Sequence, residues 1–304
     1  MKRALVTGAA GFIGTPLTRA LLARGYAVTM LDMRSAAVYH PHARVITFDI
    51  RDRAELAKLA GGYDVVFHLA ANTENRPGLA GRYDDYDITV GGTVALLEAL
   101  VTDAAPVTVL ASTQLVYGGD AGDADETAPL RPPTSFAAAK AAAEAFLCAY
   151  AERAGGSAVV CRLANVVGPG ITRGVVADLA TRLRDDPTRL RVLGDGRQRR
   201  AFVHIDDCVM AFLTVAEAAC DGLSVYNVSN SDSITVAEVA RIVVESHPAS
   251  DAQIEFAGGS AWGGDATALH PDPGRLLSLG WRPTHTSREA VWAAAQDMFR
   301  HAER

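Results

Sequence analysis

The chain has 304 residues, of which 49% are hydrophobic and 21% are charged; this composition predicts a folded protein with a substantial core and excludes a largely disordered chain. The formal net charge of −6 argues against non-specific nucleic-acid binding, which needs a basic surface. There is no apolar run of membrane-helix length, no signal peptide before the first predicted strand, and no closely spaced pair among the four cysteines. We therefore expect a cytoplasmic protein with reduced thiols and no membrane partner, and the eight scattered histidines give no support for a metal site.

The first predicted elements are a strand, a glycine-rich turn and a helix. Residues Lys2–Thr7 form a short apolar run typical of a buried strand, and Thr15–Arg24 have helical periodicity. Between them stand Gly8, Gly11 and Gly14. This order is typical of dinucleotide binding, because the three glycines allow a tight turn, a close approach to a pyrophosphate and close packing of helix on strand. The amino terminus of the helix would present free N–H groups to the phosphates.

The second predicted strand, Tyr26–Leu31, ends at Asp32. An acidic residue in this place hydrogen-bonds the adenosine ribose and disfavours the additional phosphate of NADP. Arg34 follows two residues later and would leave some room for NADP, although a solvated arginine after a strand is the simpler interpretation. The sequence therefore predicts NAD as the cofactor.

Further strands and helices alternate along the first half of the chain, which predicts an α/β fold: a Rossmann-type, doubly wound parallel sheet with ligands at the carboxyl ends of its strands. The predicted strands are Val45–Phe48, Val65–Leu69, Val107–Ala111 and Ala158–Leu163, and the predicted helices are Arg53–Leu59, Val90–Val101 and Phe136–Arg153. Later helices at Val175–Arg184 and Val236–Glu245, with a glycine-rich stretch at Gly258–Asp265, fit a smaller C-terminal substrate domain.

Seven sequence motifs carry a family resemblance: TGAAGFIG, HLAA, ASTQLVYG, the lysine of SFAAAK, RLANVVGPG, GDGRQRRAFVHIDD and LGWRP. They resemble the extended short-chain dehydrogenase/reductases, and more narrowly the NAD-dependent sugar-nucleotide epimerases and dehydratases. The resemblance implies an NAD-binding domain over residues 1–165, to which 201–229 return, and a substrate-binding domain over 166–304. It also implies a homodimer built on the helices at Val90–Val101 and Phe136–Arg153.

The resemblance also implies a set of cofactor contacts. Asp49 and Ile50 would flank the adenine, Leu69 to Ala71 would line the central ribose and pyrophosphate, and Thr89 stands where relatives usually carry asparagine. The full expected set is Gly8, Gly11, Phe12, Ile13, Gly14, Asp32, Arg34, Asp49, Ile50, Leu69, Ala70, Ala71, Thr89 and Lys140.

The expected catalytic residues depart from the family pattern at one position. Thr113 matches the hydroxyl residue that grips the reacting sugar hydroxyl, and Lys140 matches the lysine that holds the nicotinamide ribose, but Phe136 stands where the family has its catalytic tyrosine. Loss of a positioned acid/base costs about 10²- to 10⁴-fold in rate. Either another side chain acts as the base, or the reaction needs no strong base there, or the protein has lost catalysis.

The candidate replacement for the tyrosine is Glu74, in the loop after HLAA that reaches the sugar in this family. A solvated loop carboxylate is the alternative interpretation of Glu74, and Tyr117, Tyr83 and Tyr86 are weaker candidates.

Other substrate contacts follow from the resemblance. Gln114 and Leu115 stand where 4,6-dehydratases carry Asp-Glu, which argues against a dehydratase of that common mechanism. Arg200 matches an arginine that grips the sugar diphosphate, and Trp262 replaces a second such arginine. The expected substrate-binding residues are Thr73, Glu74, Asn75, Thr113, Gln114, Phe136, Asn165 and Arg200.

These patterns favour an NAD-dependent epimerase that acts on a nucleotide-activated sugar by transient oxidation and re-reduction. Within enzymes, the alternatives are a related dehydratase or an NAD(P)-dependent dehydrogenase/reductase. From another class, the alternative is an NAD-binding sensor or scaffold without turnover.

Overall fold

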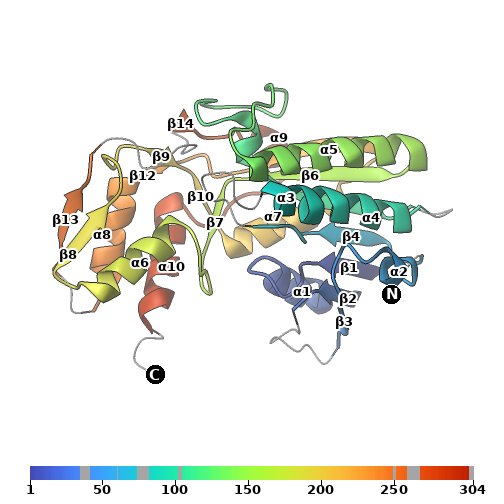
Figure 1. The fold of residues 1–304 in the computed structure, drawn as a ribbon, viewed down its shortest axis with the longest axis horizontal. Helices are drawn as coiled ribbons and strands as arrows, with labels where there is room; N and C mark the ends of the chain where they lie inside the picture. Colours follow the sequence, from blue (N-terminus) through green and yellow to red (C-terminus); the bar gives the residue numbers. More distant parts are fainter. Residues whose placement is uncertain are drawn as a thin grey trace. The chain divides into compact units, whose positions relative to one another are not determined.

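The computed structural model describes residues 1–34, 42–59, 61–73, 82–101, 105–248, 251–258 and 268–300, which Figure 1 labels by element. The chain divides into two compact units. The first unit consists of Met1–Val116, Leu130–Arg162 and Val209–Tyr226, and the second of Tyr117–Pro129, Leu163–Cys208 and Asn227–Arg304.

The first unit is built on a seven-stranded sheet with the strand order β11-β6-β5-β4-β1-β2-β3. Strands β1, β2, β3, β4 and β5 pair in parallel, so their carboxyl ends lie at one edge. This arrangement confirms the predicted Rossmann-type fold, with β6 and β11 extending the sheet beyond β5. The strands are β1 (Arg3–Thr7), β2 (Ala27–Asp32), β3 (Arg44–Thr47), β4 (Val65–His68), β5 (Val107–Thr113), β6 (Ser157–Leu163) and β11 (Gly222–Val228).

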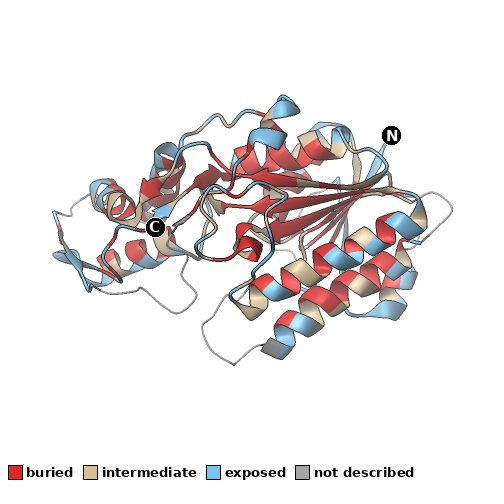
Figure 2. Cartoon of the chain, turned by 90° about the horizontal axis from the view of Figure 1, so that it is seen from above, coloured by how far each residue is buried: buried red, intermediate tan, exposed pale blue. Residues whose placement is uncertain are grey.

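Helices flank this sheet and bury one face each, so that buried and exposed residues alternate along them (Figure 2). The longest, α5, begins after Thr134, whose hydroxyl caps it by accepting from the Ala137 N–H, and it ends at Gly155, which adopts the left-handed conformation at φ +61°. A threonine N-cap commonly starts a helix, and a left-handed glycine commonly ends one. The helices are α1 (Gly14–Ala23), α2 (Arg53–Ala57), α3 (Arg82–Asp84), α4 (Gly92–Ala99), α5 (Ser135–Ala154) and α7 (Ile205–Glu217), with the 3₁₀ helix η2 (Gln114–Tyr117).

A π-helix, η1 (Asp85–Gly91), runs directly into α4. From the sequence we expected an ordinary helix beginning at Val90, so this boundary was wrong. Apolar periodicity reports which face of a helix is buried, and it does not distinguish the wider π-helical turn from the α-helical one. Strand β11 and the C-terminal helix α10 (Ser287–Arg300) are further elements that the sequence interpretation did not contain.

The second unit has its own core, formed where α6, α8 and α10 pack together. Helix α8 begins with a capping box, in which Thr235 and Glu238 satisfy each other's backbone N–H groups. The helices are α6 (Val175–Asp185), α8 (Val236–Ser246), α9 (Gly274–Ser278) and α10, and the strands are β7 (Asn165–Val167), β8 (Arg189–Val192), β9 (Arg199–Arg200), β10 (Phe202–His204), β12 (Ile234–Thr235), β13 (Gln253–Phe256) and β14 (Ala268–Leu269). Among the helices that the structure describes in either unit, none combines the length and the apolar character needed to cross a membrane.

Candidate functional site

The glycine turn between β1 and α1 is shaped so that side chains cannot enter it. Gly8 has φ +67°, and a Cβ added there would lie 2.8 Å from the backbone N of Ala70. A Cβ at Gly14 would lie 2.3 Å from the backbone O of Gly8, while the Gly11 N–H donates to that same oxygen at 3.0 Å. The turn is therefore packed against the loop after β4, and it leaves the backbone open to a bulky phosphate group. These residues fit a dinucleotide.

Asp32 lies at the carboxyl end of β2 and is 9% exposed. Its Oδ2 accepts from the Ala10 N–H at 3.0 Å, and its Oδ1 accepts from the Arg34 N–H at 2.9 Å. The carboxylate thus ties the glycine turn to β2, and each oxygen keeps a lone pair for a ribose hydroxyl. The Arg34 side chain is 67% exposed and approaches Asp32 only at 3.5 Å.

The next acidic position, Asp49, is already paired. Arg51 contacts Asp49 Oδ2 at 2.6 Å and Asp87 Oδ2 at 2.5 Å. The hydrogen bond from Arg51 lowers the pKa of Asp49, so this carboxylate stays ionised. Ile50 is buried, and it packs so closely on Gly92 that a Cβ there would lie 2.6 Å from its Cγ2. Arg51 was missed from the sequence, where nothing distinguishes it from a solvated arginine.

A hydrogen-bond network fixes His68 at the end of β4. Its Nδ1 lies 2.8 Å from Thr7 Oγ1, and its Nε2 lies 3.0 Å from Thr93 Oγ1. The Thr93 hydroxyl donates to the Thr89 carbonyl at 2.5 Å, so it must accept from His68 Nε2–H. Thr7 then donates to Nδ1, and its oxygen accepts from the Ala70 N–H at 3.2 Å.

The network therefore assigns a neutral His68, and the pKa agrees with that assignment. Complete burial, with a smaller contribution from the charge of Lys140, lowers the pKa of His68 to about 3. His68 holds the HLAA segment, including the expected cofactor contacts Leu69 to Ala71, against β1. The HLAA motif in the sequence does not by itself indicate this role for its histidine.

Lys140 is 5% exposed, and its Nζ donates to the Ala111 carbonyl of β5 at 2.6 Å. Burial lowers the pKa of Lys140 to about 8, and nearby Glu144 opposes that shift. Glu144 is itself buried, where it accepts from Arg162 at 2.8 Å and from the Ser112 hydroxyl. The Lys140 ammonium is thus held near the carboxyl end of β5. The nearby Glu144 carboxylate is already paired with Arg162, so it compensates the charge of Lys140 only in part.

Thr113 and Phe136 complete this edge of the first unit. Thr113 is the last residue of β5 and is half-buried, and its Oγ1 accepts from the Leu115 N–H at 3.3 Å. Phe136 is half-buried in the first turn of α5, one turn before Lys140. Gln114 is buried, and within the described part of the chain its Oε1 has no hydrogen-bond partner.

The three tyrosines that could substitute for the phenol missing at position 136 differ in their burial. Tyr117 is buried in the second unit, where its hydroxyl donates to Asn227 Oδ1 at 2.7 Å. Tyr83 and Tyr86 are 73% and 61% exposed. Thr73 is exposed, while Glu74, Asn75 and Trp262 lie outside the described residues.

The expected diphosphate residues lie in the second unit. Asn165, in β7, donates through its Nδ2 to the Ala201 carbonyl at 3.1 Å. Arg200, in β9, is half-buried and donates to the Arg199 carbonyl at 2.9 Å. Arg199 is engaged with Ser233 at the neighbouring strand β12.

The second unit also contains a cluster of His204, Asp207 and His285, whose potential ligand atoms lie within 4.8 Å of one another. The two imidazole rings are stacked, with centroids 3.9 Å apart and planes inclined by 22°. A metal binds in the plane of an imidazole ring, so stacked rings are poorly placed to share one ion. Both oxygens of Asp207 already accept bonds from Thr284 and His285. The cluster is therefore a clamp between the first turn of α7, which belongs to the second unit, and the 284–286 loop.

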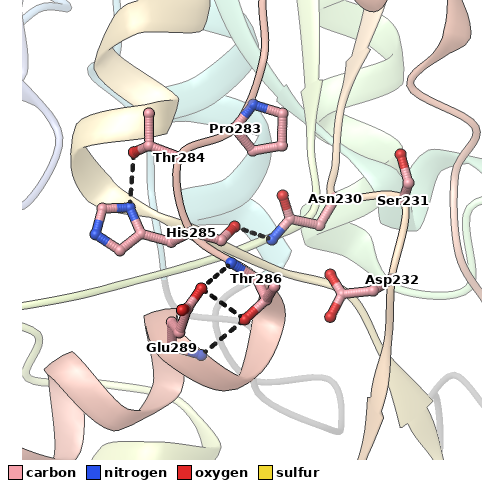
Figure 3. Close-up of a pocket in the computed structure, with 8 residues that line it drawn as sticks. All are labelled: Asn230, Ser231, Asp232, Pro283, Thr284, His285, Thr286 and Glu289. Atoms are coloured by element: carbon pink, nitrogen blue, oxygen red, sulfur yellow. Dashed lines mark hydrogen bonds between the residues drawn. The ribbon is translucent and has the colours of Figure 1, made fainter.

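A polar hollow of about 280 Å³ lies beside this clamp (Figure 3). Its two carboxylates serve the start of α10: Glu289 accepts from the Thr286 N–H and hydroxyl at 2.8 Å, and Asp232 accepts from the Ser287 N–H at 3.1 Å. These acceptors satisfy backbone groups that a helix start leaves unpaired, so the two carboxylates have a structural role. The residues that line it are Asn230, Ser231, Asp232, Pro283, Thr284, His285, Thr286 and Glu289.

Comparison with known proteins places this geometry in a family. The model of the NAD dependent epimerase/dehydratase family matches residues 4–229. UDP-N-acetyl-alpha-D-glucosaminuronate decarboxylase of Bacillus cytotoxicus is 30% identical over 257 residues, which cover 79% of this chain and 78% of that protein.

Two solved structures are similar over almost the whole chain. A crystal structure of UDP-galactose 4-epimerase superposes with a TM-score of 0.88 at 33% identity, covering 98% of this chain and 99% of that one. MoeE5 in complex with UDP-glucuronic acid and NAD superposes with a TM-score of 0.87 at 30% identity, covering 99% of each chain. The predicted cofactor, NAD, is confirmed, and the chain belongs to the NAD-dependent epimerase/dehydratase family of extended short-chain dehydrogenase/reductases.

Proposed function

We propose that the protein is an NAD-dependent epimerase acting on a nucleotide-activated sugar, with Phe136 in place of the usual catalytic tyrosine. The observation that carries the proposal is the buried Lys140 of α5, which is bonded to β5 in the same sheet whose strand β1 leads into an intact glycine turn. A buried cation costs stability, so its presence beside β5 supports a working cofactor site. The relatives that bind or act on UDP-sugars support a sugar nucleotide as substrate.

In this proposal, the glycine turn and Asp32 would hold NAD, which would supply reversible hydride transfer at a sugar carbon. The Thr113 hydroxyl holds the reacting sugar hydroxyl, and Lys140 holds the nicotinamide ribose through its Nζ. Glu74 takes and returns the hydroxyl proton that the missing phenol would have taken. The sugar-binding site is lined by Thr73, Asn75, Gln114 and the side chain of Phe136.

The domain assignment belongs to the same proposal. The first unit would hold the cofactor through the contacts named from the sequence, including Phe12, Ile13, Asp49, Ile50 and Thr89. The second unit would hold the sugar diphosphate through Asn165 and Arg200.

The test is to incubate the purified protein with NAD and a panel of UDP- and dTDP-sugars and to separate the products by chromatography. An isomer with the mass of the substrate supports the epimerase. A product that has lost water indicates the dehydratase, and net NADH formation indicates the dehydrogenase. NAD binding without any product, which the phenylalanine at position 136 specifically favours, indicates the sensor or scaffold.

Cofactor preference is expected to depend on Asp32. NAD should bind more tightly than NADP in calorimetric titration, because the carboxylate accepts from the ribose hydroxyls and repels a phosphate there. Asp32→Ala should weaken NAD binding by about 10- to 100-fold, the value of a hydrogen bond to a charged group. The matched control is Glu152→Ala, which removes an exposed carboxylate on α5 and should leave the NAD affinity within about twofold. Tighter binding of NADP than of NAD by the parent protein would contradict the assignment.

A homodimer is expected from the exposed faces of α4 and α5, whose alanines allow helices to approach closely. Light scattering at micromolar concentration should give twice the chain mass of 32.0 kDa. Phe146, on α5, is 47% exposed, and Phe146→Glu should shift the mass toward the monomer. Trp292, on α10, is 40% exposed, and Trp292→Glu is the control that should leave the dimer intact. A monomer mass for the parent would refute this proposal.

A further inference from the structure

A buried carboxylate lies beside Phe136, and neither the family resemblance nor the proposed mechanism uses it. Asp85 is the first residue of η1 and is 3% exposed. Its Oδ2 accepts from the Ser135 hydroxyl at 2.5 Å, and its Oδ1 accepts from Asn72 Nδ2 at 2.9 Å. A carboxylate is costly to bury, so it persists only where its bonds are needed.

The two partners of Asp85 belong to the two chain segments that surround the site of the missing phenol. Ser135 is the first residue of α5 and directly precedes Phe136. Asn72 follows the HLAA segment, in the loop that continues from β4. The hydrogen bonds of Asp85 span 50 residues to Ser135 and 13 residues to Asn72, so neither follows from local chain geometry.

The π-helix makes a second tie to the same loop. Thr89, four residues after Asp85, accepts from the Asn72 N–H at 3.1 Å. Asn72 is therefore held through its side chain and through its backbone by one face of η1. π-Helical segments are uncommon and occur frequently at functional sites.

We propose that Asp85 is a positioning residue that fixes the loop after β4 and the first turn of α5 relative to each other. The inference rests on the proposed function, since it concerns the walls of the same site. With a phenylalanine at position 136, no phenol can bind the reacting hydroxyl of the sugar. The position of the sugar then depends on how the loop after β4 and the first turn of α5 are held. A displacement of about 1 Å in a reacting group costs about 10²-fold in rate.

The kinetic test compares Asp85→Ala, Asp85→Asn and Asp84→Ala with the nucleotide sugar that the parent turns over. Asp85→Ala should lower kcat by about 10- to 100-fold, while the NAD affinity measured by calorimetry stays within about twofold. Asp85→Asn should recover most of kcat, because an amide can accept from Asn72 and donate to the Ser135 oxygen. Asp84 is the adjacent, exposed carboxylate, and Asp84→Ala should behave as the parent.

Two results of these kinetics would overturn the proposal. An Asp85→Asn variant as slow as Asp85→Ala would mean that the carboxylate charge itself takes part in the chemistry. A double variant of Asp85→Ala with Ser135→Ala that is slower by the product of the two single effects would mean that Asp85 does not act through Ser135.

Hydrogen exchange separates failure of this inference from failure of the proposed function. In the NAD-bound protein, Asp85→Ala should speed amide exchange in residues 70–73 and 135–140, and Asp84→Ala should not. If the parent turns over no sugar nucleotide, the proposed function fails. Faster exchange in both segments would still support the positioning role of Asp85. Unchanged amide exchange in Asp85→Ala overturns the positioning role of Asp85, whether or not the parent is active.

Discussion

Glu74→Gln is expected to abolish turnover, while Phe136→Tyr gains little. If Glu74 is the base, its amide replacement cannot take the sugar hydroxyl's proton, and kcat should fall by about 10²- to 10⁴-fold. NAD affinity should not change, because the proposed cofactor contacts do not include Glu74. Steady-state kinetics with the first active sugar nucleotide, together with NAD titration of each variant, measure both effects.

The opposite pattern would identify a different mechanism. If Phe136 only replaces the tyrosine of an otherwise unaltered epimerase site, Phe136→Tyr places a phenol near Thr113 and Lys140 and should raise kcat by an appreciable part of about 10²- to 10⁴-fold. A large gain in Phe136→Tyr with an unaffected Glu74→Gln would refute Glu74 as the base. Absence of turnover in the parent and both variants, with NAD still bound, would favour the sensor.

Lys140→Met is expected to stabilise the fold while it destroys the activity. The buried ammonium has a pKa lowered to about 8, against an ordinary value of 10.5, so at neutral pH the folded protein holds a charge that it would hold more easily when unfolded. Removing that charge should raise the free energy of unfolding at pH 7 by about 1–3 kcal/mol, after the loss of the hydrogen bond to Ala111. Turnover should fall by about 10²-fold, because the nicotinamide ribose loses the group that positions it.

The pH dependence of the stability tests the lowered pKa of Lys140 directly. Between pH 8 and 10.5 the unfolded chain binds the lysine proton more than the folded chain does, so the parent gains stability as the pH rises, by about 1.4 kcal/mol per unit. The stability advantage of Lys140→Met should therefore shrink across this window and disappear above it. Denaturant unfolding at several pH values measures the difference. A constant advantage from pH 7 to 10.5 would show that burial does not lower the pKa of Lys140.

The fold class and the glycine turn could be predicted because their signals are local. Gly8 and Asp32 stand at the ends of apolar strands and Gly14 begins the first helix. The spacing of a strand, a turn and a helix is short enough to recognise in one sequence. The family resemblance added Thr113 and Lys140 by their motifs.

The contacts that hold the site together could not be predicted, because they join residues far apart in the chain. His68 meets Thr7 across 61 residues and Thr93 across 25, and Asp85 meets Ser135 across 50. No periodicity indicates such a pair, since it depends on which strands become neighbours in the sheet. For the same reason Asp85 reads, in the sequence, as one more solvated acid in a run of charged residues.

The division into units has a consequence for how the protein is made. The chain passes from one unit to the other after residues 116, 129, 162, 208 and 226, so no single cut releases either unit intact. The sheet of the first unit receives its edge strand β11 only from Gly222–Val228. During synthesis the glycine turn therefore leaves the ribosome early, but its sheet cannot be completed until more than 200 further residues have followed. The first unit therefore remains incomplete until most of the chain has been translated.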